Sequence, residues 1–82
     1  MTEQNNTVSY PAAFTKESDG GYSVTFRDVP EAITQGDALE EAKQMAGFAL
    51  TTAFEFYRED VRRIPAPSAI QNDEVLITVK RM

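Results

Sequence analysis

The feature that most constrains this chain is a helical pattern of apolar residues that runs from about Ala38 to Glu59. At about 100° per residue, the pattern collects most of its apolar side chains on one stripe. The stripe contains Leu39, Ala42, Ala46, Ala49, Leu50, Ala53 and Tyr57, with Phe54 and Val61 on one shoulder and Met45 and Phe56 on the other. Its four alanines would let the helix lie close against a sheet. Asp37 and Glu40 have the spacing of a capping box at its start.

Two alternating segments joined by a glycine turn precede the helix. In residues 8–14, Tyr10 and Phe14 share a face with Ala12, while Pro11 indicates an edge strand or a side that needs no donor. In residues 22–26 the alternation resumes after Asp19-Gly20-Gly21. The pattern therefore predicts an antiparallel hairpin, in which Phe14 and Tyr22 would be cross-strand neighbours.

Two further strands complete the predicted fold. Residues 32–34 form a short third strand, and the β-branched residues 75–79 form the last one, after the proline-rich segment 64–68 has ended the helical region. This order predicts an α+β domain: an antiparallel β-β-β meander, one long helix packed on the sheet, then a final strand. We expect residues 1–7 to form a disordered N-terminal tail and residues 8–82 to form a single domain.

Composition excludes several classes of function. The chain has no cysteine and no histidine, which removes thiolate chemistry and the commonest general base and metal ligand. Thirteen acidic and eight basic residues give a net charge of −5. This charge disfavours binding to the phosphate backbone of nucleic acids and favours binding to a basic partner. The sequence has neither a signal-peptide pattern nor an apolar run long enough for a membrane span. We therefore expect a cytoplasmic protein.

An enzyme built from these residues would depend on carboxylates, and their positions do not favour one. The first strand carries no acid, Asp19 lies in a turn, and Asp28 follows the second strand. Glu40 and Glu41 diverge by about 100° on the helix, so they would not converge on one ion. The glycines match no phosphate-binding loop. We predict no catalytic residue, no metal site and no cofactor.

Two features remain open between a structural and a functional role. Phe48 projects onto the polar half of the helix, either as a partly exposed aromatic residue or as a contact with a second chain. Arg58, Arg62 and Arg63 form a basic cluster that either complements the helix dipole or binds nucleic acid weakly.

A series of short motifs resembles the HicB antitoxin family over nearly the whole chain after residue 8. The motifs are Tyr10-Pro11-Ala12 with Phe14, Asp19-Gly20-Gly21-Tyr22-Ser23-Val24 with Phe26, Asp28-Val29-Pro30, Thr34-Gln35-Gly36-Asp37, Glu40-Glu41-Ala42 and Ile64-Pro65-Ala66-Pro67-Ser68. Each motif is weak alone, but the order and spacing together are fairly specific. The resemblance implies a partial ribonuclease-H-like fold that lacks the catalytic acids of that enzyme.

The resemblance also implies a partner. Members of the family bind and neutralise a small basic mRNA-cleaving toxin of the HicA type. Two departures from the family pattern limit which of its properties can be expected of this chain. The turn at residues 27–32 lacks the glycine common in the family, and no C-terminal DNA-binding module follows the last strand. We therefore expect no direct DNA binding by this chain, whether it is a stand-alone protein or a fragment.

Charge complementarity selects the candidate contacts with such a toxin. They are Asp19, Asp28, Glu31, Glu40, Glu41 and Glu55, with Phe48 as an apolar anchor. Each acid could instead be a solvated surface charge. A regulatory or small-molecule-binding module without a toxin is the alternative function. The small core and Phe48 favour a homo-oligomer, a dimer or a tetramer.

Overall fold

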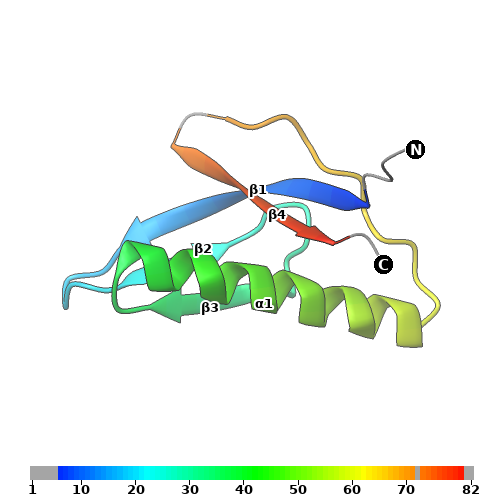
Figure 1. The fold of residues 1–82 in the computed structure, drawn as a ribbon, viewed down its shortest axis with the longest axis horizontal. Coiled ribbons are helices and arrows are strands. Elements are labelled where there is room, and N and C mark those ends of the chain that lie inside the picture. Colours follow the sequence, from blue (N-terminus) through cyan, green and yellow to red (C-terminus); the bar gives the residue numbers. More distant parts are fainter. Residues whose placement is uncertain (1–5, 72, 81–82) are drawn as a thin grey trace, which may run out of the picture.

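The computed structural model describes residues 6–71 and 73–80 as one sheet with a single helix laid across it (Figure 1). The elements, in chain order, are β1 (Thr7–Lys16), β2 (Tyr22–Thr25), β3 (Ile33–Gly36), α1 (Leu39–Glu59) and β4 (Glu74–Lys80). This arrangement confirms the predicted α+β class and element order. Most of the predicted tail lies outside the described residues, and β1 already includes Thr7.

The sheet has the strand order β3-β2-β1-β4, and every neighbouring pair is antiparallel. The central position of β1 contradicts the prediction that Pro11 marks an edge strand. The alternative holds, because the ladder between β1 and β2 starts only at Ala13, opposite Thr25. Pro11 is paired with Leu76 of β4 alone, so β2 requires no donor from it.

The glycine turn between β1 and β2 closes the predicted hairpin. The Glu17 N–H donates to the Gly21 carbonyl at 2.7 Å, and the Gly20 N–H donates to the Glu17 carbonyl at 3.0 Å. Gly20 has a φ of 102°, a conformation that costs glycine little and other residues much more. Phe14 lies opposite Val24, and Tyr22 lies opposite Lys16. Phe14 and Tyr22 are therefore diagonal neighbours and not the direct pair that we predicted.

The core lies between the helix and one face of the sheet. On the sheet side, Tyr10, Ala12 and Val24 are buried, and the Tyr10 ring meets Phe54 edge-on at 5.5 Å between centroids. The helix contributes its predicted stripe: Ala42, Ala46, Leu50, Ala53, Phe54 and Tyr57 are buried. The stripe is narrower than predicted, because Leu39, Met45 and Phe56 are 40%, 37% and 56% exposed.

Gly36 fixes how closely the helix approaches β3. A Cβ atom at this position would lie 2.6 Å from the backbone nitrogen of Ala42 and 2.8 Å from its Cα. Such distances are far inside van der Waals contact, so a side chain would push the first turn of α1 away from the end of β3. Glycine is required here for space, and the short connection through Asp37 depends on it.

The predicted capping box is wrong by one residue. The N-cap is Ala38, whose side chain offers no acceptor, and the helix starts at Leu39. The carboxylate of Glu41, in place of Glu40, accepts a hydrogen bond from the Asp37 N–H at 2.8 Å. Two acids in the first turn, Glu40 and Glu41, still complement the positive end of the helix dipole.

The helix ends in a Schellman motif with valine in the left-handed position. The Arg62 N–H donates to the Tyr57 carbonyl at 2.8 Å, and the Val61 N–H donates to the Arg58 carbonyl at 3.0 Å. Val61 has a φ of 55° and is 90% exposed, so it does not pack on the shoulder of the stripe as predicted. A β-branched residue in this conformation is strained.

Replacing Val61 with glycine should therefore stabilise the protein. We expect Val61→Gly to raise the free energy of unfolding by about 1 kcal/mol, because glycine adopts positive φ without the Cβ clash. For a domain of this size, that corresponds to about 4–8 °C in Tm, measurable by circular dichroism. Val61→Ala is the matched control, since it keeps the Cβ atom and should change Tm little. Equal Tm values for the two variants would contradict the strain at this position.

Candidate functional site

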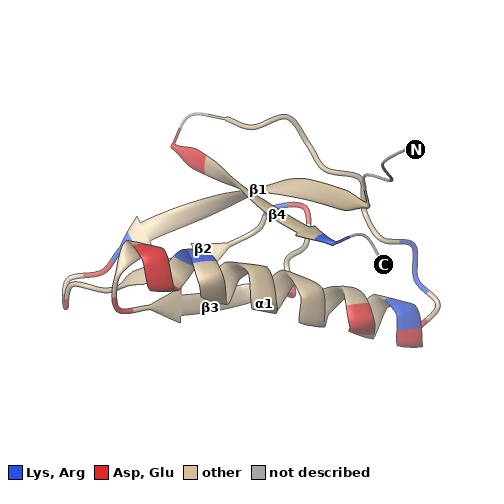
Figure 2. Cartoon of the chain, in the orientation of Figure 1, with Lys and Arg blue, Asp and Glu red and all other residues tan. Residues whose placement is uncertain are grey.

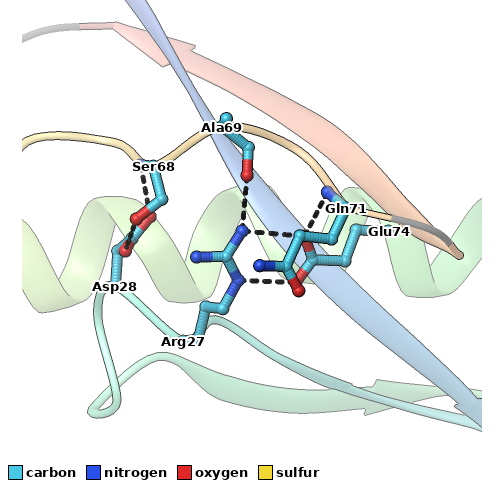
Figure 3. A network of polar contacts seen from close by, with 6 residues as sticks. All are labelled: Arg27, Asp28, Ser68, Ala69, Gln71 and Glu74. Atoms are coloured by element: carbon cyan, nitrogen blue, oxygen red, sulfur yellow. Dashed lines mark hydrogen bonds and ion pairs between the residues drawn. The ribbon is translucent and has the colours of Figure 1, made fainter.

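A polar network ties the connection between α1 and β4 to the end of the hairpin (Figure 3). Asp28 accepts hydrogen bonds from the Ser68 N–H, at 2.8 Å, and from the Ser68 hydroxyl. Next to it, Arg27 donates to both carboxylate oxygens of Glu74, at 2.9 and 3.1 Å, and to the Ala69 carbonyl. The network therefore joins two of the motifs found in the sequence, the one at residues 28–30 and the one at residues 64–68.

Hydrogen bonding in this network favours the ionised carboxylates. Partial burial on its own would raise the pKa of Asp28, but the two hydrogen bonds from Ser68, helped by the nearby charge of Arg27, lower it. The hydrogen bond from Arg27 is the main reason why the pKa of Glu74 is lowered, and the Gln71 N–H adds to it. Both acids thus stabilise the fold most when they are charged.

A second polar cluster lies at the C-terminal end of α1. The Tyr57 hydroxyl donates to Glu31 at 2.8 Å, and Arg62 donates to the same carboxylate at 3.2 Å. The Arg62 guanidinium also lies 4.0 Å from the centroid of the Tyr57 ring. The pKa of Glu31 is lowered, chiefly by the hydrogen bond from Tyr57. These contacts favour a structural role for Arg62 within the basic cluster.

The seven predicted contact residues do not form one surface. Asp28 and Glu31 are engaged in the two internal networks. Asp19 accepts a hydrogen bond from the Gly21 N–H at 3.2 Å and remains exposed in the hairpin turn. The side chains of Glu40 and Glu55 make no hydrogen bond or ion pair in the described part of the chain. Phe48 stands apart from the acids, 66% exposed, in a groove beside β4.

Five carboxylates gather where the hairpin turn meets the start of the helix, at the left of Figure 2. We call this region the acidic end; it comprises Glu17, Asp19, Asp37, Glu40 and Glu41. A hollow of about 230 Å³ separates the hairpin turn from the end of β3 and is lined by three of these acids. The sequence analysis did not select Glu17 and Asp37 as contact residues. The pairing of β2 with β3, in which Tyr22 lies opposite Gly36, would have placed them together.

Two negative findings apply to residues 6–71 and 73–80. No three Asp or Glu side chains lie close enough together there to hold a metal ion. No helix in that part of the chain is both long enough and apolar enough to cross a membrane.

The fold is that of an antitoxin N-terminal domain. The structure superposes on the crystal structure of the N-terminal domain of Burkholderia pseudomallei antitoxin HicB with a TM-score of 0.67. The match covers 92% of this chain and 99% of that domain, at 17% sequence identity. A likeness at this level of identity defines the fold alone.

Sequence comparison defines the family. Residues 9–80 match the model of the HicB-like antitoxin of bacterial toxin–antitoxin systems. Antitoxin HicB 1 of Photorhabdus laumondii is 53% identical over 68 residues, and antitoxin HicB of Escherichia coli K12 is 47% identical over 72 residues. The chain belongs to the HicB-like antitoxin family, which confirms the resemblance found in its motifs. The matches cover 83% and 88% of this chain but 44% and 52% of those relatives, about half of their length.

The Asp28 network yields a test by mutation and pH. We expect Asp28→Ala to lower the free energy of unfolding by about 1–3 kcal/mol at neutral pH, because Ser68 loses a charged acceptor. A carboxylate with a lowered folded-state pKa contributes stability above its unfolded pKa of about 3.9 and loses it as the pH falls through the folded value. The gap between wild type and variant should therefore close in acid.

Urea denaturation at a series of pH values measures that gap. Glu55→Ala is the matched control, since Glu55 has no partner in the described part of the chain and its loss should change stability little. If the difference in unfolding free energy between wild type and Asp28→Ala stayed constant down to strongly acidic pH, the charge of the Asp28 carboxylate would not be what holds the connection between α1 and β4.

Proposed function

We propose that this domain is a non-enzymatic antitoxin that binds and neutralises a small basic mRNA-cleaving toxin of the HicA type. The observation that carries the proposal is the match of residues 9–80 to a family of antitoxins. Because the chain spans about half of its curated relatives, the proposal also holds that this half is sufficient for neutralisation. The activity would take place in the cytoplasm, where mRNA is cleaved.

The acidic end is the surface that we assign to the toxin. Its carboxylates come from the hairpin turn, the link before the helix and the first helical turn. Lys16, at the end of β1, and Lys43, in the second turn of α1, offset part of this charge, but the acids outnumber them and the region stays negative. A basic RNA-binding face would be drawn to this field and covered by it, which keeps RNA out. Asp19, Glu40 and Glu41 remain contacts in this proposal, joined by Glu17 and Asp37.

The other predicted contacts take different roles in the proposal. Asp28 and Glu31 already use their oxygens within the domain, so we assign them to maintaining the fold. Glu55 lies on the helix near Arg58 and Glu59, where the charges of both signs offset each other. A contact with the toxin there would be of the weak kind typical of an interface rim.

The test is an RNA-cleavage assay with the small basic protein encoded beside this gene, titrated with the domain. We expect cleavage to be lost at a stoichiometric ratio. In the variant Asp19→Asn/Asp37→Asn/Glu40→Gln, we expect the association rate at low salt to fall about tenfold, because the steering charge is removed. Added salt should slow the wild type toward the variant.

The control variant removes the same number of charges elsewhere. Glu55→Gln/Glu59→Gln/Asp73→Asn lowers the negative charge equally but leaves the acidic end intact, so its association rate should stay near that of the wild type. Equal rates for the two triple variants would overturn the assignment of this surface. Undiminished cleavage by an active ribonuclease at excess domain would overturn the proposed neutralisation itself.

A further inference from the structure

The acidic end has exposed apolar surface next to it, at the β3 edge of the sheet. Charged contacts steer a partner and fix its orientation, but most of the affinity of an interface comes from a few well-buried central residues. The acidic end consists of charged groups, so a stable complex requires apolar surface beside it. Ile33 on β3 provides such surface, because its side chain is 66% exposed three residues before the end of the strand.

β3 is an edge strand with a free side. It stands at the end of the order β3-β2-β1-β4, so no strand in the described part of the chain pairs with its outer side. Its four residues carry neither charge nor proline, two of the devices that protect such edges. Its short length limits an added strand to a few paired residues, which suits a specific contact better than open-ended association. The strand ends at Gly36, directly before Asp37 of the acidic end.

The helix exposes a second apolar side chain on the same side of the domain. Figure 1 shows α1 running back along β3. Lys43 and Gly47 line the groove beside β4, so they mark the flank of the helix that faces the other edge of the sheet. At about 100° per residue, Met45 and Ala49 lie on the opposite flank, toward β3. Ala49 is half-buried, and Met45 is 37% exposed.

A strand added to β3 would cover both apolar residues. Thr34 lies opposite the buried Val24, so it faces the helix, and Ile33 faces the other side of the sheet. The side chains of a strand alternate between its two faces. In a strand placed beside β3, one set of side chains would therefore cover Ile33, and the alternate set would cover Met45 on the flank of the helix.

Charge identifies the occupant of this edge. Asp37 follows β3 and Glu41 lies in the first turn of α1, so carboxylates border one end of the edge. At the other end, Arg62 offsets the charge of Glu31. The groove at the opposite edge of the sheet is lined by two lysines, with no acid among the described residues that line it. A basic partner is therefore attracted to the β3 edge and repelled by the β4 edge.

We propose that the basic toxin adds a strand to β3, and that Ile33 and Met45 form the apolar centre of the complex beside the acidic end. The inference rests on the proposed neutralisation and specifies how the partner is held. The added strand would carry apolar residues next to Ile33 and Met45, and lysine or arginine where it reaches Asp37. The charges of the acidic end then set the rate of association, and the β3 edge sets the rate of dissociation.

Binding kinetics with the small basic protein encoded beside this gene test the inference. Ile33→Thr/Met45→Gln removes the apolar centre, changes no charge and keeps strand and helix propensity. We expect its association rate to stay near that of the wild type and its dissociation to be roughly 30-fold faster, as for hot-spot residues. Leu76→Thr/Phe48→Gln is the matched control. Both of its side chains are exposed beside β4, at 48% and 66%, so it should dissociate like the wild type.

Hydrogen exchange of the wild type gives a second readout. The β3 amides that point away from β2 should exchange more slowly in the complex than in the free domain, because an added strand would accept their hydrogen bonds. This readout decides the matter if Ile33→Thr/Met45→Gln loses its helical circular dichroism signal. A neutralised toxin with unprotected β3 amides, or with unchanged dissociation from the folded variant, would overturn this inference alone. A toxin that stays active at excess domain would overturn the proposed function as well.

Discussion

The close packing of α1 on the sheet is the constraint on which the rest of the structure depends. Alanines at positions 42, 46 and 53 leave little side chain between the helix and the strands, and all three are buried. Gly36 allows the first turn to start directly above the end of β3. Because the helix starts there, Glu40 and Glu41 lie beside the hairpin turn. Because the helix is pressed against the sheet, Phe48 remains outside, next to β4.

The distribution of charge follows from this packing and from the polar networks. Asp28, Glu31 and Glu74 serve the fold by binding Ser68, Tyr57 and Arg27. Those contacts hold the proline-rich connection and the end of the helix in place without disulfides, which the absence of cysteine rules out. At the acidic end, the carboxylates of Glu17, Asp19 and Glu41 each accept one hydrogen bond, from Ser23, Gly21 and Asp37 respectively, and bind no arginine in the described part of the chain. These acids lie together at one end of the domain, which is the reason why we assign that end to a basic partner.

Periodicity predicted the fold well, since period-2 strands and a period-3.6 stripe are local properties of the sequence. What failed depends on contacts between distant residues. The central place of β1 could not be deduced from Pro11. A proline is tolerated in a central strand where the neighbouring strand needs no N–H from it, and here the pairing between β1 and β2 starts only after Pro11. The roles of Asp28 and Glu31 required knowing that Ser68 and Tyr57 lie beside them. The strained Val61 departs from the glycine expected at a helix end, so no local signal indicated it.

Amide chemical-shift mapping of the isotope-labelled domain against the small basic protein encoded beside it tests the account most directly. We expect the shifts to be concentrated at the hairpin turn around Gly20 and Gly21 and in the first turn of α1, with β4 and Phe48 little changed. Shifts centred on β4 and Phe48, with an unaffected acidic end, would contradict the assignment of the acidic end to the basic partner.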